Sequence, residues 1–133
     1  GCLMGLELFC LSLILYHEAR GEPRVGQLAV AEVVLNRVVD HRYPNSVCEV
    51  MEQEHNGVCH FSFWCDGLPD NPENKELWEE INSTTKQLFY NYPELNLTQG
   101  ATHYHHIDIH PIWAENLTKI VQIQNHIFYR WEK

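Results

Sequence analysis

Glu18 is the side chain of this sequence best placed for acid–base chemistry. It follows a mostly apolar stretch, residues 6–15, and precedes a Gly/Pro turn over residues 21–23. Since the stretch must be buried and the turn exposed, the carboxyl group lies at the boundary between core and solvent. Such a position disfavours the charged form, raises the carboxyl pKa towards neutrality and keeps a proton available for a leaving group. The alternative is a structural role, in which Glu18 and Glu22 form a helix-end pair bonded to Arg20 or to backbone amides.

An aromatic loop over residues 59–67 is the second feature that could do chemistry. Three aromatic side chains fall within four residues of this loop, and Ser62 and Asp66 lie beside them. Aromatic rings in a Gly-bounded loop either cover the core or form a platform on which the apolar faces of sugars stack. Both interpretations stay open at this point.

A histidine-rich stretch, residues 100–106, is the third such feature. On a β-strand, His103 and His105 would share one face, and Thr102 and Tyr104 would share the other. Paired histidines suggest a zinc site, but a zinc hydrolase needs three protein ligands and an open position. The sequence has no HExxH motif, and no serine lies in the Gly-x-Ser-x-Gly turn typical of a Ser–His–Asp hydrolase. A zinc site therefore stays an alternative to acid–base chemistry.

The composition is that of one globular domain. The chain has 133 residues, 44% of them hydrophobic, and a formal net charge of −9. We therefore expect a single domain over residues 1–133, without room for a separate binding module, and a monomer. The negative charge argues against nucleic acid and anionic membranes as partners, because both need clustered basic residues. No segment approaches the roughly 20 apolar residues of a membrane span, and residues 6–15 lack the basic flank and cleavage site of an export signal.

The five cysteines allow a disulfide but do not define one. Cys48, Cys59 and Cys65 are close enough in sequence for one bond among them, and a reduced, buried state is equally compatible. The odd count leaves at least one thiol free, and no Cys-x-x-Cys pair suggests zinc or redox chemistry.

Hydrophobic periodicity predicts a mostly helical chain that ends in β-structure. The expected elements are helices over residues 6–16 and 27–39, a short helix near 47–51, an irregular loop over 55–70, an amphipathic helix ending near 90, an extended segment over 101–105, and a hairpin of 119–123 with 127–131. Asn71 and Pro72 are the expected cap and first residue of the amphipathic helix. Asn36, Arg37 and Gln53 are polar side chains near surface predicted to be buried.

Several motifs follow one another along nearly the whole chain. They are residues 18–22, 26–38 and 43–48, Gln53, Phe61 with Ser62, residues 65–67, 100–105, Pro111, residues 113–114 and residues 126–129. In this order they closely resemble the SleB-type cell wall hydrolases, a family that includes spore cortex-lytic enzymes and phage-encoded relatives such as endolysins. The likeness covers about residues 6–130. Position 60 departs from it, because His60 stands where relatives generally carry Gln.

The resemblance implies a predominantly helical α+β domain, lysozyme-like or lytic-transglycosylase-like, with a small C-terminal β-hairpin or sheet. It also implies cleavage of the bond between N-acetylmuramic acid and N-acetylglucosamine in peptidoglycan glycan strands, and thus action at the bacterial cell wall. Glu18 matches the family's catalytic glutamate. We expect a lytic transglycosylase that leaves 1,6-anhydro ends and needs neither metal nor cofactor. The expected sugar-positioning residues are Gln53, Phe61, Ser62, Thr102, His103 and Tyr104, and Asp66 is the candidate second carboxylate if the reaction is hydrolysis.

Two other functions stay open. A zinc-dependent N-acetylmuramoyl-L-alanine amidase would use His103, His105 and one more ligand, and chelation by EDTA would abolish its activity. A non-catalytic glycan-binding module would use the aromatic loop, and Glu18→Gln would leave its binding intact.

Overall fold

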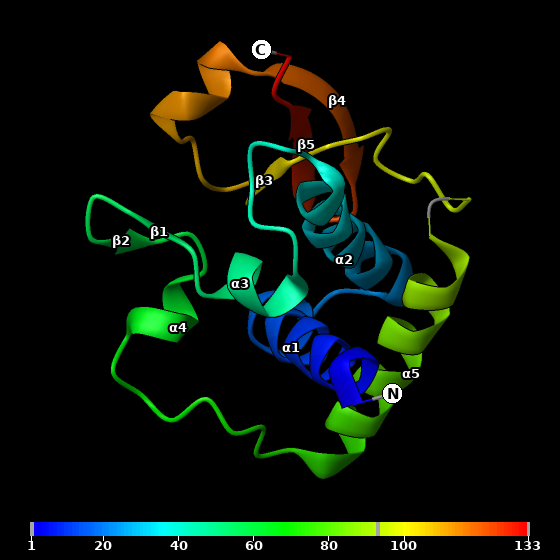
Figure 1. The fold of residues 1–133 in the computed structure, drawn as a ribbon. Coiled ribbons are helices and arrows are strands. Elements are labelled where there is room, and N and C mark those ends of the chain that lie inside the picture. The colour runs from blue at the N-terminus through cyan, green and yellow to red at the C-terminus, as the bar shows by residue number, and fades with distance from the viewer. Residues whose placement is uncertain (1, 93, 133) are drawn as a thin grey trace.

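Three long helices form the body of the fold, and a small antiparallel sheet lies at one end of it (Figure 1). The structure, a computed structural model, describes residues 2–92 and 94–132. The long helices are α1 (Cys2–Ala19), α2 (Arg24–Val39) and α5 (Lys75–Asn91). The other elements are α3 (Val47–Met51), β1 (Glu54–His55), β2 (Val58–Cys59), α4 (Ser62–Cys65), β3 (His103–His106), the 3-10 helix η1 (Ile112–Asn116), β4 (Thr118–Ile123) and β5 (His126–Arg130). The predicted α+β architecture with a small C-terminal sheet is confirmed.

Helix α1 is longer than the sequence predicted, and this places Glu18 inside its last turn. The helix continues three residues past its predicted end, to Ala19, which is itself buried in the core. The Glu22 backbone N–H then donates to the Ala19 carbonyl at 3.0 Å and closes a turn before α2. Helix α2 is buried over residues 26–35, as expected for the central helix of the fold.

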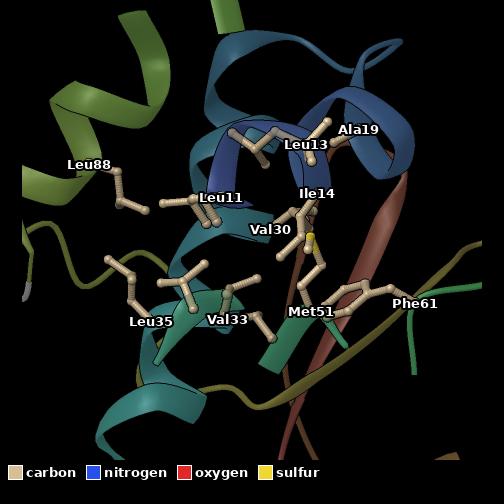
Figure 2. Close-up of a cluster of buried hydrophobic side chains, with 14 of the residues drawn as sticks. Leu11, Leu13, Ile14, Ala19, Val30, Val33, Leu35, Met51, Phe61 and Leu88 are labelled. Atoms are coloured by element: carbon tan, nitrogen blue, oxygen red, sulfur yellow. The ribbon is translucent and has the colours of Figure 1, made fainter. Parts of the chain in front are cut away.

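Side chains from α1, α2, α3 and α5 meet in one hydrophobic core (Figure 2). Leu11 and Ile14 of α1, Val30 of α2 and Leu88 of α5 are fully buried. Burying a side chain of this size stabilises a protein by about 1.5–3 kcal/mol. The core therefore fixes the helices to one another and gives the C-terminal turn of α1 a defined position. None of the described helices is long and apolar enough to cross a membrane.

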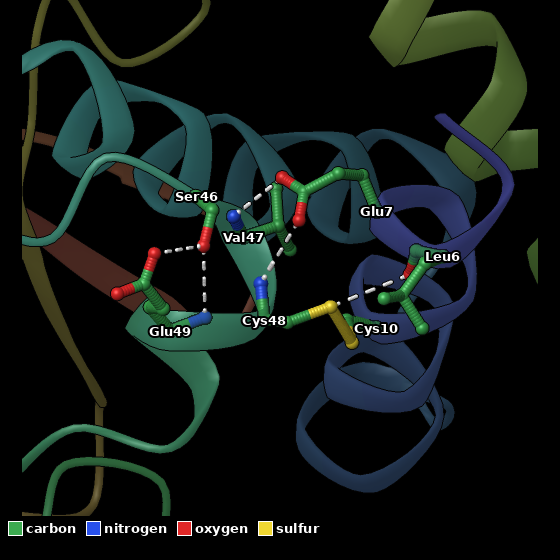
Figure 3. The surroundings of a disulfide bond; sticks show 7 residues. All are labelled: Leu6, Glu7, Cys10, Ser46, Val47, Cys48 and Glu49. Atoms are coloured by element: carbon green, nitrogen blue, oxygen red, sulfur yellow. Dashed lines mark hydrogen bonds between the residues drawn. A yellow bond between two sulfur atoms is a disulfide. The ribbon is translucent and has the colours of Figure 1, made fainter. Parts of the chain in front are cut away.

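Helix α3 is tied to α1 by a disulfide and by a side-chain cap (Figure 3). Cys10 of α1 and Cys48 of α3 form the disulfide, with their Cα atoms 5.3 Å apart. The Glu7 carboxylate accepts a hydrogen bond from the Val47 backbone N–H at 2.6 Å, and Ser46 caps the helix through its side chain. The sequence did not predict this disulfide, because its two cysteines are 38 residues apart along the chain.

The segment between α3 and α5 has more structure than the irregular loop predicted for residues 55–70. It contains the β1–β2 hairpin, with Asn56 and Gly57 at positive φ in its turn, and the short helix α4. A disulfide between Cys59 and Cys65 closes the aromatic loop. This bond is one of the pairings that the sequence allowed.

Helix α5 begins later than predicted. Asn74, not Asn71, is its N-cap, and the Asn74 side chain accepts from the Leu77 backbone N–H at 3.0 Å. The Tyr16 hydroxyl of α1 accepts from the backbone N–H groups of Glu73 and Asn74 at 3.2 and 3.1 Å. This tertiary contact fixes the chain just before the helix and overrides the local cap-and-proline signal.

The C-terminal sheet has the strand order β3–β5–β4, and both pairs are antiparallel. Strands β4 and β5 form the predicted hairpin, and Tyr104 of β3 pairs with Phe128 of β5. Phe128 is fully buried and belongs to the same core as the helices. The sheet thus packs on α2 and presents β3 to the end of α1.

Candidate active site

A pocket of about 620 Å³ lies beside the C-terminal turn of α1. Its walls come from α1, α2, β3, η1 and the β1–β2 hairpin, which are far apart in the sequence. The hairpin and η1 project on the same side of the molecule (Figure 1). The lining residues are Glu18, Arg37, His55, Asn56, Val58, Cys59, His60, Phe61, His103, Tyr104 and Trp113.

Glu18 is the one carboxyl group among the described residues that line this pocket. The Tyr104 hydroxyl donates a hydrogen bond to Glu18 Oε1 at 2.8 Å. Burial raises the pKa of Glu18, and this effect outweighs the hydrogen bond from Tyr104 and the charges of His17 and Arg37, which lower it. Glu18 therefore keeps its proton to higher pH than an exposed glutamate, as a general acid requires.

Tyr104 is held in place by the sheet that carries it. Its ring lies 5.3 Å from the His126 ring in an edge-on contact and 5.9 Å from the Phe128 ring. Burial, followed by the charge of Glu18, raises the pKa of Tyr104 well above its usual value. The hydroxyl thus stays protonated and serves as a permanent donor to Glu18.

Glu22 fixes the β4–β5 turn to the turn between α1 and α2. Its carboxylate accepts from the backbone N–H and the side-chain amide of Asn125 at 3.2 and 3.0 Å. His126 Nδ1 lies 3.2 Å from Glu22 Oε1. Burial alone would raise the pKa of Glu22, but the bonds from Asn125 and the charge of His126 lower it overall. The helix-end pair with Arg20 is replaced by these contacts, and the Arg20 guanidinium lies over a tyrosine ring instead.

The two histidines of β3 have different environments. His103 lines the pocket, with its ring 5.3 Å from that of Trp113, and burial lowers the pKa of His103 to about 4, so the ring is neutral near pH 7. His105 is buried beneath the pocket. Its Nδ1 lies 2.7 Å from the His106 carbonyl oxygen, and its Nε2 lies 2.8 Å from the Tyr129 hydroxyl. Since both of its ring nitrogens are engaged, His105 is not available as a zinc ligand beside His103.

A different cluster holds the side chains whose spacing could suit a metal ion. Within the part of the chain that the structure describes, the one such group of three is Glu54, Cys59 and Cys65. Its two cysteines form the disulfide of the aromatic loop, so no thiolate is present to bind a metal. The geometry thus gives the zinc amidase no support.

Four of the predicted site residues lie outside this pocket. Gln53 is half-buried, and its Oε1 has no hydrogen-bond partner among the described residues. Ser62 is exposed at the start of α4, and Thr102 is buried behind the pocket wall with its hydroxyl 3.0 Å from His103 Nδ1. Asp66 is exposed at the end of α4, where it accepts from a backbone N–H at 2.9 Å. Asp66 therefore does not join Glu18 as a second carboxylate.

The pocket brings together four of the residues that the sequence predicted and adds others. Glu18, Phe61, His103 and Tyr104 line it. The residues that had not been predicted as site residues are His55, Asn56, Val58, Cys59, His60, Trp113 and Arg37. The Asn-Gly pair at 56–57 is a hairpin signal that could have located the hairpin wall.

Comparisons with known proteins match the chain to one protein family and to several spore cortex-lytic enzymes. The family model described as Cell Wall Hydrolase matches residues 21–129, a segment that begins just after Glu18. The spore cortex-lytic enzyme of Bacillus cereus is 31% identical over 120 residues, which make up 85% of this chain and 40% of the relative. The spore cortex-lytic enzyme of Halalkalibacterium halodurans is 31% identical over 127 residues, 92% of this chain and 34% of the relative. The chain thus spans about two fifths or less of these curated relatives.

Two solved structures have the same fold. The catalytic domain of the germination-specific lytic transglycosylase SleB from Bacillus anthracis superimposes with a TM-score of 0.73 at 27% identity, and the match covers 93% of each chain. The catalytic domain of the Bacillus cereus SleB protein gives a TM-score of 0.69 at 27% identity, covering 93% of this chain and 89% of that one. The arrangement of helices and sheet is therefore that of the SleB catalytic domain.

Proposed function

We propose that this chain, which belongs to the cell wall hydrolase family, cleaves the bond between N-acetylmuramic acid and N-acetylglucosamine in peptidoglycan as a lytic transglycosylase. The observation that carries the proposal is a single carboxyl group, Glu18, of raised pKa in a pocket whose other described lining residues include no carboxylate. Hydrolysis by the usual route needs a second carboxylate near the scissile bond. A transglycosylase needs only one, because no water has to be activated.

Glu18 would act twice in this reaction. It first gives its proton to the glycosidic oxygen as positive charge develops at the muramic acid ring. The Tyr104 hydroxyl occupies Glu18 Oε1, which leaves Oε2 to carry the proton. The resulting carboxylate then takes the proton of the muramic acid 6-hydroxyl, whose oxygen closes onto the anomeric carbon as a 1,6-anhydro ring. Glu18 is protonated again at the end, and no water is consumed.

Ring-stacking side chains on the pocket wall support a sugar substrate. The exposed Trp113 ring and the half-buried, neutral His103 ring line the space around Glu18, beside the buried Phe61 ring, and aromatic faces suit the apolar faces of sugars. The mutual coverage of 93% with the Bacillus anthracis SleB catalytic domain supports the view that residues 1–133 act as one catalytic domain. The partner is then the peptidoglycan glycan strand, and the site of action is the bacterial cell wall.

Product analysis tests this function. Purified peptidoglycan is digested with the wild type and with Glu18→Gln, and the soluble fragments are identified by mass spectrometry. Wild type is expected to release fragments with 1,6-anhydromuramic ends, one water lighter than hydrolysis products, and Glu18→Gln is expected to release none. Reducing muramic ends would instead assign hydrolysis, and release of free stem peptides would assign an amidase.

The non-catalytic alternative is decided by the same two proteins. A glycan-binding module would bind insoluble peptidoglycan equally well as wild type and as Glu18→Gln, and neither protein would clear a peptidoglycan suspension. Clearing by wild type alone, with binding retained by Glu18→Gln, excludes it.

A further inference from the structure

His60 is an exposed histidine in the pocket wall, between β2 and α4. Its backbone N–H donates to the Gln53 carbonyl oxygen at 3.0 Å, so the base of the β1–β2 hairpin holds its backbone in place. The next residue, Phe61, is buried in the core and lines the same pocket. The His60 side chain is thus a polar ring on an anchored backbone, accessible to a ligand in the pocket.

Arg37 contacts one nitrogen of this ring. Arg37 Nη1 lies 3.3 Å from His60 Nδ1, and Arg37 Nε donates to the Thr102 carbonyl oxygen at 2.7 Å. The guanidinium is only 6% exposed, and its carbon lies 5.7 Å from the centroid of the Phe61 ring, within the range of cation–π attraction. Arg37 of α2 therefore connects the wall that carries His60 to the segment that leads into β3.

The contact with Arg37 decides which nitrogen of the neutral His60 ring carries the proton. A guanidinium has donors only, whereas a neutral imidazole has one N–H donor and one nitrogen acceptor. Nδ1 must therefore accept from Arg37, and the proton lies on Nε2. No hydrogen bond joins His60 Nε2 to a residue that the structure describes, so this N–H can donate to a ligand in the pocket.

Protonation of His60 would break this arrangement. An imidazolium carries a proton on both ring nitrogens, so Nδ1 could no longer accept from Arg37, and two cations would face each other. Burial, followed by the charges of Arg37 and His55, lowers the pKa of His60 below that of a free histidine. The ring is therefore mainly neutral at pH 7.5 and gains its second proton only in acid. The other titratable groups that described residues bring to this pocket are Glu18, His103 and Tyr104.

We propose that His60 binds the glycan by donating its Nε2–H to an oxygen atom of a sugar, that Arg37 holds this donor in place, and that protonation of His60 in acid weakens glycan binding. The inference rests on the proposed function, since it concerns how the same pocket holds the glycan. A glutamine could do the same at any pH, because its amide offers an acceptor to Arg37 and a donor to the sugar, and it does not titrate.

Binding of a soluble glycan tests the inference without any cleavage. The probe is a tetrasaccharide of alternating N-acetylglucosamine and N-acetylmuramic acid with its stem peptides attached, titrated by calorimetry between pH 7.5 and pH 4.5. The protein carries Glu18→Gln, which prevents cleavage and removes the titration of Glu18. Its dissociation constant is expected to rise about twofold to tenfold as the pH falls, which is the range for one hydrogen bond.

Two substitutions of His60 in the same Glu18→Gln protein separate the donor from its titration. His60→Gln is expected to bind equally tightly at pH 7.5 and to lose this weakening in acid. Acid also titrates the stem peptides of the probe, but this affects both proteins equally. His60→Ala is expected to bind about twofold to tenfold more weakly at pH 7.5 already, because the donor is missing.

An NMR titration of the His60 ring protons tests the part played by Arg37. His60→Gln identifies the ring signal by its loss. Arg37→Gln removes the neighbouring cation, so the pKa of His60 and the midpoint of the change in binding are both expected to move to higher pH. His41→Gln is the matched control, because the His41 side chain is 95% exposed and does not line this pocket; it should keep the whole pH dependence.

Three results of the binding measurements overturn the inference, whether or not Arg37→Gln folds. They are an equal pH dependence with His60 and with His60→Gln, equal binding with His60 and with His60→Ala at pH 7.5, and no binding of the tetrasaccharide at millimolar concentration. An unmoved pKa of His60 in folded Arg37→Gln overturns the role of Arg37. Release of anhydro ends by wild type at pH 7.5 would still support the proposed function in each of these cases.

Discussion

Tyr104→Phe removes the hydroxyl that donates to Glu18 and leaves the ring in place. The bond is 2.8 Å long, and a hydrogen bond to a charged group contributes about 1.5–3 kcal/mol. Since this bond favours the carboxylate form, its loss raises the pKa of Glu18 further. Glu18 must be protonated to start the reaction, so the high-pH limb of the kcat/KM profile is expected to move to higher pH. If the free energy of this hydrogen bond were lost entirely from the transition state, kcat would fall by about tenfold to a hundredfold, which is the largest decrease expected.

The assay is the rate at which purified peptidoglycan is solubilised over a series of pH values. Tyr90→Phe is the matched control, because Tyr90 is exposed on α5 and its hydroxyl contacts only Met4 Sδ among the described residues. Its profile is expected to coincide with that of wild type. A Tyr104→Phe profile that also coincides with wild type would refute the idea that this hydroxyl sets the acidity of Glu18. If Tyr104→Phe lowered the thermal stability but did not move the high-pH limb of the kcat/KM profile, the role of Tyr104 would be packing alone.

Three further predictions concern stability. Glu18→Gln is expected to raise the thermal midpoint at pH 7 but not below pH 4. The pKa of Glu18 is higher in the folded protein than in the unfolded chain, so its carboxyl group destabilises the fold only above the pKa that it has in the unfolded chain. Equal shifts of the midpoint at both pH values would contradict this. Glu22→Gln is expected to cost about 1–3 kcal/mol at pH 7, and less as the pH falls through the lowered native pKa of Glu22, in denaturant titrations at several pH values. Cys10→Ser opens a loop of 38 residues and is expected to lower the free energy of unfolding by about 4 kcal/mol. Cys59→Ser opens a loop of 6 residues and is expected to lower it by about 2 kcal/mol. Urea denaturation in which Cys59→Ser were the more destabilising of the two would refute the loop-entropy argument.

The position of Glu18 could be predicted because it depends on local pattern alone. An apolar helix that meets a Gly/Pro turn must leave its last polar residue at the edge of the core, and the structure has Glu18 there, in the last turn of α1. The same applies to the buried α2 and to the β4–β5 hairpin, whose signals lie within their own sequences. The start of α5 could not be predicted in this way, because the Tyr16 hydroxyl on another helix sets it.

The walls of the pocket depend on contacts between distant segments, and there the sequence was less informative. Alternation along β3 predicts that Tyr104 and His103 lie on opposite faces of the strand, yet both residues line the pocket. Ser62 and Asp66 were chosen because they adjoin the aromatic rings, yet the turn of α4 directs both to solvent. Arg37 was noted only as a polar residue on an apolar helix, and its importance depends on the pocket that α2 helps to build.

The two glutamates of the 18–22 motif show why position in the fold, not residue type, assigns their tasks. Glu18 is half-buried with one hydrogen-bond donor, Tyr104, and burial raises its pKa. Glu22 is also half-buried, but the hydrogen bonds from Asn125 and the charge of His126 lower its pKa. Environments that shift the pKa values of two carboxyl groups in opposite directions give the two groups different tasks. Here Glu18 is the candidate acid, and Glu22 has the structural role of an anchor between the β4–β5 turn and the α1–α2 turn. The anchor also serves the acid, because Glu22 holds the turn of the hairpin whose strand β5 pairs with β3, and His126 contacts the ring of Tyr104. A shift of the sheet by about 1 Å would carry the Tyr104 hydroxyl out of hydrogen-bonding range of Glu18, so the strength of the acid depends on how the sheet docks on the helices.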